Sequence, residues 1–132
     1  MVQSPSRRPL VVVVDDDEAV RDALAFALDL EGFAVETYDS GEALLLRDPT
    51  RAPAACLVLD ERLPGVSGLA TLAQLRERRL ASPAILITTH PGPFLRETAR
   101  KAGVPIVEKP LLSDTLVAAI EAAIAGRQAD HA

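Results

Sequence analysis

Short apolar runs alternate with longer helical patterns along this chain of 132 residues. Runs rich in Val, Ile and Leu that extend over only four or five residues are typical of buried parallel strands. A further segment, residues 33–38, alternates apolar and polar side chains, which predicts a half-exposed strand at a sheet edge. The pattern therefore predicts five strands, of which four are buried runs at residues 10–14, 56–59, 84–87 and 104–107.

Helical patterns occupy the segments between these strands. Apolar residues at helical spacing predict helices over residues 18–30, 42–46, 94–102 and 113–125, and another that carries Leu69, Leu72 and Leu75. We expect N-terminal caps at three serines and helix ends at three glycines, namely Ser40, Ser67, Ser113, Gly32, Gly103 and Gly126. Five strands that alternate with five helices predict a three-layer α/β domain.

Polar residues able to handle phosphate come at the end of each buried run. Asp15 and Asp16 follow the first run, Asp60 the second and Thr88 the third, and Lys109 lies one residue beyond the fourth. Ligands of open parallel sheets bind outside the carboxyl ends of the strands. We therefore expect three carboxylates, a hydroxyl and an ammonium group to converge on one edge of the sheet.

Such a cluster suits phosphoryl chemistry. Two carboxylates about 4 Å apart repel by roughly 4 kcal/mol at an effective dielectric constant of about 20, so the acids need a cation or a raised pKa. Oxygen ligands suit Mg²⁺. A metal ion beside Asp60 would let its carboxylate attack phosphorus to form an acyl phosphate. Lys109 and Thr88 would then pair with the phosphoryl oxygens.

Each of these residues has a plainer interpretation when it is taken alone. The acids at positions 15–18 could serve merely as a cap at the start of a helix. Asp60 could merely be part of the turn that contains Pro64. Thr88 and Lys109 could be structural or solvated residues. The joint pattern at four separate strand ends favours the phosphoryl chemistry.

Composition narrows the class of protein. Hydrophobic residues make up 48% of the chain and aromatic residues 3%, which predicts an aliphatic core. The single cysteine, Cys56, excludes an internal disulfide, is expected in that core and fits the reducing cytoplasm. No apolar run approaches the roughly 20 residues of a membrane span, and no signal peptide is recognisable. A net charge of −5 without a dense basic block argues against direct nucleic-acid binding.

Four sequence strings occur in the same order as the motifs of a known family, and with similar spacing: VVVVDDDEAVRDAL, LVLDERLPGVSGLATL, AILITTHPG and VEKP. They resemble the receiver domains of two-component response regulators, the CheY-like fold. The resemblance covers about residues 9–126 and implies a (βα)5 flavodoxin-like fold with the parallel strand order 2-1-3-4-5. We expect residues 1–8 and 127–132 to be flexible flanking segments.

The resemblance implies a metal site and a phosphoacceptor. Asp60 would accept the phosphoryl group and bind the metal, Mg²⁺ or Mn²⁺. Asp16 would bind the ion directly, Asp15 through water and Arg62 through its backbone carbonyl. The acidic pair is identified as Asp15 and Asp16 because Arg21 lies five residues after Asp16, as in the family.

The resemblance also implies a switch. Thr88 would supply the switch hydroxyl, Thr89 a backbone contact to the phosphate and Lys109 its pairing cation. The peptide bond before Pro110 would be cis, as is common only before proline. Asp17 is a surplus acid that we expect to face solvent near the site and to tune its charge.

Two positions depart from the family pattern. Ile106 stands three residues before the lysine, where the family usually has Tyr or Phe, so a movement of Thr88 must be read out through backbone or aliphatic packing. Thr89 stands where Ala or Gly is more common, and its bulk could hinder small phosphodonors. Arg62 and His90 are expected to flank the phosphate and set its lifetime.

These features predict a signalling module that catalyses its own phosphorylation and dephosphorylation, and not an enzyme. A histidine kinase or a histidine phosphotransfer protein would donate the phosphate, and a homodimer could form through the fourth and fifth helices. We expect a single-domain regulator. The alternatives are a receiver excised from a larger DNA-binding regulator or hybrid kinase, a pseudo-receiver scaffold, and an aspartyl-phosphate phosphatase. The phosphatase is disfavoured because Arg62 occupies the position of its general acid, and the complete set of acids, Thr and Lys argues against the scaffold.

Overall fold

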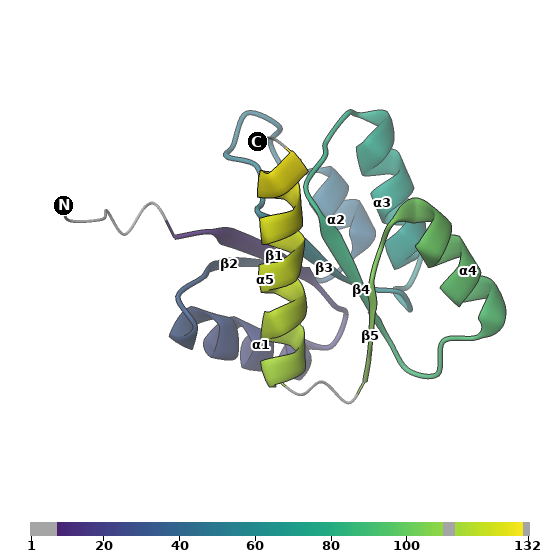
Figure 1. Ribbon diagram of the computed structural model, residues 1–132, viewed down its shortest axis with the longest axis horizontal. Helices are drawn as coiled ribbons and strands as arrows, with labels where there is room; N and C mark the ends of the chain where they lie inside the picture. Colours follow the sequence, from purple (N-terminus) through teal and green to yellow (C-terminus); the bar gives the residue numbers. More distant parts are fainter. Residues whose placement is uncertain (1–7, 110–112, 131–132) are drawn as a thin grey trace.

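The computed structural model describes residues 8–109 and 113–130 as a sheet covered by helices on both faces (Figure 1). The strands are all parallel and follow the order β2-β1-β3-β4-β5, which confirms the predicted fold. The elements, in chain order, are β1 (Leu10–Val14), α1 (Glu18–Leu30), β2 (Ala34–Tyr38), α2 (Gly41–Leu45), β3 (Cys56–Asp60), α3 (Gly68–Glu77), β4 (Ala84–Thr88), α4 (Pro93–Ala102), β5 (Ile106–Glu108) and α5 (Ser113–Asp130).

Two apolar clusters lie on the two faces of the sheet, because successive residues of a strand point to opposite sides. On one face the strands pack against α1 and α5 through Val11, Val13, Val58, Leu24, Leu28, Leu116 and Ile120. On the other face they pack against α2, α3 and α4 through Val12, Val14, Leu57, Leu59, Leu44, Leu72, Leu75 and Ala99. The central strands β1, β3 and β4 are therefore apolar on both sides, as their uninterrupted hydrophobic runs predicted. Cys56 is fully buried at the start of β3, also as predicted.

The edge strand β2 is half-buried, as its alternating pattern predicted. It begins one residue later than expected, because Phe33 lies just before it in the core beside α1. Glu36, in the middle of β2, forms ion pairs with Arg47 at 2.9 Å and with Arg51 at 2.5 Å. These pairs tie the edge strand to the segment that follows α2.

The predicted caps at Ser40 and Ser67 are present. The Ser40 hydroxyl accepts a hydrogen bond from the backbone of Ala43 at 3.0 Å, and the Ser67 hydroxyl accepts one from Ala70 at 3.1 Å. Gly103 ends α4 in the left-handed conformation. The role of Ser113 as a cap lies outside the described side chains, although α5 does begin at that residue.

The last strand is shorter than predicted at its start and begins at Ile106, not at residue 104. The backbone N–H of Val104 donates to the carbonyl of Ala99 in α4, so it closes the end of that helix. Pro105 has no N–H to give to a ladder. Val104 is nevertheless buried in the core, which explains why its apolar character suggested a strand.

The last helix is longer than predicted and continues through Gly126 to Asp130. A single glycine inside a helix costs about 1 kcal/mol relative to alanine, which is too little to end a helix between good helix formers. At the other end of the chain, Arg8 contacts the segment that joins α1 to β2. Its guanidinium donates to the backbone carbonyls of Asp29, Gly32 and Phe33 at 2.7–3.2 Å.

Over the described part of the chain, no helix has the length and apolar character needed to cross a membrane.

Candidate functional site

The carboxylates of Asp15, Asp16 and Asp60 meet at the carboxyl ends of β1 and β3. One oxygen from each of the three groups lies within 4.8 Å of the others. Asp15 is fully buried and Asp60 is 3% exposed, whereas Asp16 faces solvent. The predicted convergence of the three acids is therefore present, with one side of the cluster open to water.

Strand pairing explains this convergence. Val14 of β1 pairs with Leu59 of β3, so the next residues, Asp15 just after β1 and Asp60 at the end of β3, lie side by side. The backbone N–H of Asp15 donates to the carbonyl of Tyr38 at 3.2 Å, and the Arg21 guanidinium donates to the carbonyl of Asp15 at 2.7 Å. These bonds fix the backbone at the point where the acids begin.

Lys109 brings a positive charge to the two buried acids. Its ammonium nitrogen lies 3.2 Å from Oδ2 of Asp60 and 3.4 Å from Oδ2 of Asp15. Its backbone N–H donates to the carbonyl of Thr88 at 2.8 Å, which anchors the residue after β5 to the end of β4. The lysine is thus shared between the acids and does not belong to one ion pair.

The protonation equilibria reflect this crowding. Burial raises the pKa of Asp60, and the negative charge of Asp15 raises it further, while hydrogen bonds from the Arg62 backbone and from Lys109 oppose the rise. Burial lowers the pKa of Lys109, but its hydrogen bonds to Asp60 and Asp15 and their charges outweigh that effect, so its pKa is raised. Lys109 thus only partly offsets the burial of Asp60 and its repulsion from Asp15.

The donor set fits a hard divalent cation. All three side chains of the cluster offer carboxylate oxygens, which Mg²⁺ and Mn²⁺ prefer over nitrogen or sulfur. The exposed position of Asp16 leaves room for the water ligands that Mg²⁺ usually keeps. A second positive charge would also lower the electrostatic cost of the buried acids.

Thr88 and Ile106 lie where the switch was predicted. Thr88 is the last residue of β4 and is 2% exposed. Ile87 pairs with Asp60 in the register of β3 and β4, so Thr88 follows directly at the same edge. Ile106, the first residue of β5, pairs with Leu86 and packs against the core on the α2–α4 face.

Of the predicted flanking residues, Arg62 has a bond to the acids, and Thr89 and His90 lie in the loop that follows β4. The backbone N–H of Arg62 donates to Oδ1 of Asp60 at 3.1 Å, while the Arg62 residue as a whole is exposed. Thr89 and His90 are exposed in the β4–α4 loop, where His90 has a φ of 51°. Pro110 lies outside the described residues.

Asp17 and Glu61 have roles at this edge that the sequence did not reveal in full. Asp17 is exposed, as expected, and its carboxylate also caps α1 by accepting from the backbone N–H of Ala19 at 2.9 Å. This bond supports the plainer interpretation of the acidic run for this one residue. Glu61 accepts from the backbone N–H of Leu69 at 2.9 Å, and burial raises its pKa. No local spacing signals that bond, because it joins residues eight positions apart through the β3–α3 loop.

Gly68 is a further residue that shapes this edge of the sheet and was not predicted from the sequence. A β-carbon on Gly68 would lie 2.6 Å from the backbone oxygen of Asp60 and 2.9 Å from Leu86. The first turn of α3 can therefore approach the end of β3 only because this position has no side chain. Its signal in the sequence was a glycine directly after a predicted cap.

A doubly wound parallel sheet with three acids, a lysine and a threonine at one edge defines a phosphate-handling α/β domain. The family model for the response regulator receiver domain matches residues 11–121, so the chain belongs to this family and is a receiver domain of two-component response regulators. The chain is 39% identical over 123 residues to the transcriptional regulatory protein FixJ of Bradyrhizobium diazoefficiens, which covers 92% of this chain and 58% of that protein. It is 36% identical over 119 residues to the response regulator protein TodT of Pseudomonas putida, covering 89% and 52%.

Solved structures agree with this family. The crystal structure named FixJ-N has 38% sequence identity and a TM-score of 0.80, and the match covers 89% of this chain and 94% of that one. A CheY-like receiver domain protein from Methanospirillum hungatei reaches a TM-score of 0.85 at 21% identity, covering 93% and 98%, and this likeness shows the fold alone. The chain spans little more than half the length of the curated regulators it matches.

Proposed function

We propose that Asp60 is the phosphoacceptor of this receiver domain and that its phosphorylation requires a divalent cation. The observation that carries the proposal is the meeting of Asp60 with Asp15, Asp16 and Lys109 at one edge of the sheet. An acid placed between a cation-binding pair and an ammonium group can accept an anion that carboxylates alone would repel.

Mg²⁺ or Mn²⁺ would be held by the side chains of Asp16 and Asp60 and by the backbone carbonyl of Arg62, with Asp15 acting through water. Its chemistry there is to neutralise negative charge on the phosphoryl oxygens. The all-oxygen cluster at the carboxyl ends of β1 and β3 supports this assignment.

The reaction would transfer a phosphoryl group from a phosphohistidine of a histidine kinase or phosphotransfer protein. An Asp60 carboxylate oxygen attacks phosphorus as the phosphorus–nitrogen bond of the donor breaks. The electron pair of that bond returns to the imidazole nitrogen, which takes up a proton. Lys109 then pairs with a phosphoryl oxygen, and the Thr88 hydroxyl donates to another. Phosphoryl transfer depends mainly on such positioning and charge neutralisation.

The signal would leave the site through β4 and β5. The backbone bond from Lys109 to Thr88, at 2.8 Å, couples the two groups that contact the phosphate. Ile106 offers an aliphatic side chain to carry the change. The exposed Thr89, whose backbone would contact the phosphate, would slow reaction with small donors. Arg62 and His90 would set the phosphate lifetime by flanking its access to water.

The output would be a change of protein contacts in a transcriptional regulator of the cytoplasm. FixJ is named as a transcriptional regulatory protein and TodT as a response regulator protein, and this chain spans 58% and 52% of them, which favours a receiver within a larger DNA-binding protein over a single-domain regulator. The receiver itself would not touch DNA. A homodimer through α4 and α5 would transmit the change, and Phe94 on α4, which is 84% exposed, offers an apolar contact for it.

The proposal is tested with Mg²⁺ and either acetyl phosphate or beryllofluoride. After incubation with acetyl phosphate, intact-mass measurement should show one phosphoryl adduct on the wild-type protein, none on Asp60→Asn, and one on the control Asp22→Asn, whose acid is exposed on α1. Beryllofluoride transfers no phosphoryl group and serves only the size-exclusion measurement. An adduct that persists in Asp60→Asn contradicts the assignment. If acetyl phosphate is too slow because of Thr89, a phosphorylated histidine kinase replaces it as donor. Elution volume in size-exclusion chromatography should shift on activation if phosphorylation drives dimerisation.

A further inference from the structure

Glu61 is the first residue of the β3–α3 loop, and it also holds the far end of that loop. The backbone N–H of Gly68 donates to the carbonyl of Glu61 at 3.2 Å, and the backbone N–H of Leu69 donates to its carboxylate at 2.9 Å. Glu61 is itself tied to β4, because its N–H donates to the carbonyl of Ile87 at 3.0 Å. One half-buried residue thus joins β3, β4 and the start of α3.

The loop that Glu61 closes carries the backbone contacts to the phosphoacceptor. The N–H of Arg62 donates to Oδ1 of Asp60 at 3.1 Å. Its carbonyl is the backbone ligand that we assign to the divalent cation. These two contacts come from the peptide groups on either side of Arg62, directly after Glu61. Their orientation therefore depends on how the loop is held at its base.

Glu61 does more than cap a helix. A carboxylate near a helix N-terminus is often only a cap, but in α3 the hydroxyl of Ser67 already accepts from the N–H of Ala70 at 3.1 Å. Glu61 reaches the helix from outside it, from the residue next to the phosphoacceptor. At the same contact, a β-carbon on Gly68 would lie 2.6 Å from the backbone oxygen of Asp60. The bond from Glu61 therefore fixes α3 against the end of β3, which a cap within the helix does not do.

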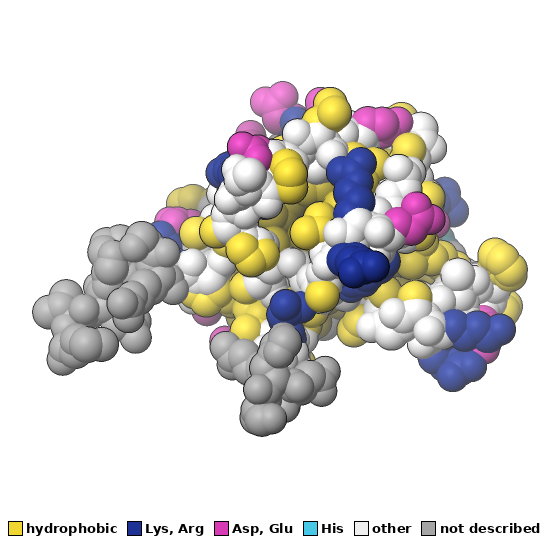
Figure 2. Space-filling view, turned by 90° about the horizontal axis from the view of Figure 1, so that it is seen from above, with side chains coloured by type: hydrophobic (Ala, Val, Ile, Leu, Met, Phe, Trp, Pro, Cys, Tyr) yellow, Lys and Arg dark blue, Asp and Glu magenta, His cyan; other side chains and the backbone are white. Residues whose placement is uncertain are grey.

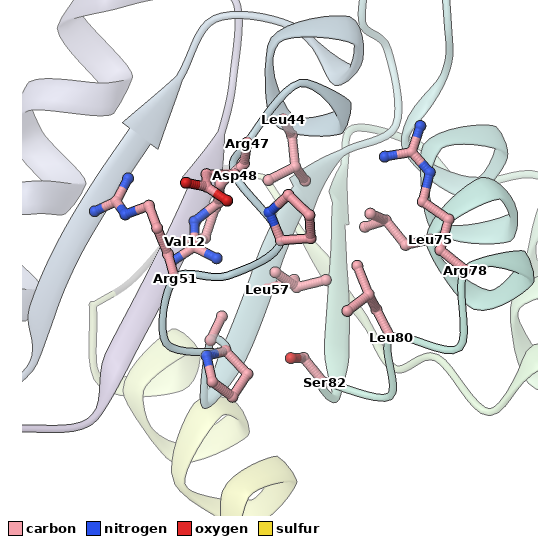
Figure 3. A pocket seen from close by; sticks show the side chains of 13 residues that line it. Val12, Leu44, Arg47, Asp48, Arg51, Leu57, Leu75, Arg78, Leu80 and Ser82 are labelled. Carbon is pink, nitrogen blue, oxygen red and sulfur yellow. The ribbon is translucent and has the colours of Figure 1, made fainter.

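The other end of α3 borders a void. An apolar cavity of about 370 Å³ lies at the amino ends of the strands, between Leu75 and Arg78 of α3 and the α2–β3 loop (Figure 3). Arg47 ties that loop to the edge strand, because its guanidinium donates to Glu36 at 2.9 Å and to the carbonyl of Ala52 at 2.8 Å. Figure 2 views this end of the molecule and shows apolar side chains in a hollow with Lys and Arg side chains beside it. Atoms that line a void have fewer packing partners, so bonds at the first turn matter more for the position of α3 than they would in a uniformly packed layer.

We propose that Glu61 is a positioning residue for phosphoryl acceptance. Its bond to the first turn of α3 holds the peptide groups of Arg62 in the orientation that serves Asp60 and the divalent cation. This inference rests on the proposed function, because the phosphoacceptor and the cation are assigned there. Groups that orient metal ligands without binding the metal typically change metal affinity about 10–100-fold when they are removed.

Two substitutions at position 61 separate the hydrogen bond from the charge. Glu61→Gln loses the charge but keeps an oxygen that accepts from the N–H of Leu69. Glu61→Asp keeps the charge, but its side chain is one methylene shorter and falls short of that N–H. A ¹H–¹⁵N NMR titration of the unphosphorylated protein with MgCl₂ measures the dissociation constant. Glu61→Asp should bind Mg²⁺ about tenfold more weakly than wild type, and Glu61→Gln within about threefold of it. The reverse order would show that the charge acts and contradicts the proposal.

Ser67→Ala is the matched control, because it removes a hydrogen bond from the same turn of α3. It should lower the urea midpoint about as much as Glu61→Asp and leave the Mg²⁺ dissociation constant unchanged. Hydrogen exchange of the Arg62 amide gives a readout that needs no metal. Exchange should become about tenfold faster in Glu61→Asp and change by less than about threefold in Glu61→Gln and Ser67→Ala. Equal effects of Ser67→Ala and Glu61→Asp on Mg²⁺ binding would leave Glu61 a purely structural role and overturn the proposal.

The reaction itself is followed by intact mass at several Mg²⁺ concentrations with acetyl phosphate as donor. The Mg²⁺ concentration that gives half of the maximal rate should rise about tenfold in Glu61→Asp and stay near the wild-type value in Glu61→Gln and Ser67→Ala. If Glu61→Asp does not fold, Glu61→Ala replaces it with the same expectation. A wild-type protein without a saturable response to Mg²⁺ contradicts the proposed function. A wild-type response that the folded Glu61 variant shares unchanged contradicts this inference alone.

Discussion

At the carboxyl ends of the strands, Asp15 and Asp60 are nearly fully buried and share one lysine at 3.2–3.4 Å. At the amino ends, charged groups such as Arg51 and Arg78 stay exposed around an apolar cavity. Charge interactions are strong where water is excluded and weak where it is not. The first site should therefore respond sharply to a single substitution, whereas the second depends mainly on apolar area and on several weak ion pairs.

The largest effect is expected from Gly68→Ala at the carboxyl end. The added methyl group would meet the backbone oxygen of Asp60 at 2.6 Å, so α3 or β3 must shift, at a cost of roughly 3 kcal/mol of unfolding free energy. Gly126→Ala is the matched control. It has open space around it inside α5 and should gain about 0.5–1 kcal/mol. Urea unfolding of both variants measures the contrast, and equal stabilities would contradict the close contact at Gly68.

A smaller effect is expected from Lys109→Met, which leaves Asp15 and Asp60 buried without their ammonium partner. Removal of one member of a buried ion pair costs about 3–5 kcal/mol, and partial exposure of the lysine, 27% of its side chain, reduces the expected loss to about 2 kcal/mol. Urea unfolding with and without saturating Mg²⁺ tests the cause. Because a divalent ion replaces the lost charge, Mg²⁺ should stabilise the variant more than the wild type, and equal stabilisation would show that the acids do not form one site.

A loss of about 1 kcal/mol is expected from Glu36→Gln, beside the loop that borders the cavity. The hydrogen bond from Arg47 outweighs burial, so the pKa of Glu36 is lowered on folding. A lowered folded pKa stabilises the protein above the unfolded value of about 4.3, and this contribution disappears as the pH falls through the folded pKa. The stability difference between wild type and variant should thus be full at pH 7 and shrink as the pH falls below the unfolded value of about 4.3. A difference that persists unchanged in acid would indicate a packing effect in place of the ion pair.

The smallest signal is expected from thiol labelling of the folded protein, because the reactivity of Cys56 should be close to zero. Burial raises the pKa of its thiol to about 12, so almost no thiolate is present at pH 8. A thiol reagent should modify the protein only as fast as it unfolds, and Gly68→Ala should increase that rate. Rapid labelling of the folded wild-type protein would show that the start of β3 opens locally.

Much of the fold could be predicted from the sequence because its determinants are local. Uninterrupted apolar runs predicted β1, β3 and β4, and the alternation in residues 33–38 predicted the edge strand. The prediction failed where two elements compete for one residue. Val104 has the character of a strand residue, yet its N–H closes α4, and Gly126 has the character of a helix end, yet α5 continues through it. Such competition is decided by contacts that a sequence pattern does not contain.

The sequence by itself determined the strands, the residues that follow them and hence the meeting of Asp15, Asp16 and Asp60, because parallel strands place their carboxyl ends at one edge. Only the tertiary structure decided that Lys109 is shared between two buried acids, and that a loop held by Arg47 leaves an apolar cavity beneath it. Strand ends follow from the periodicity of neighbouring residues. Shared charges and cavities depend on distances between segments far apart in the chain, which are set only when the layers pack.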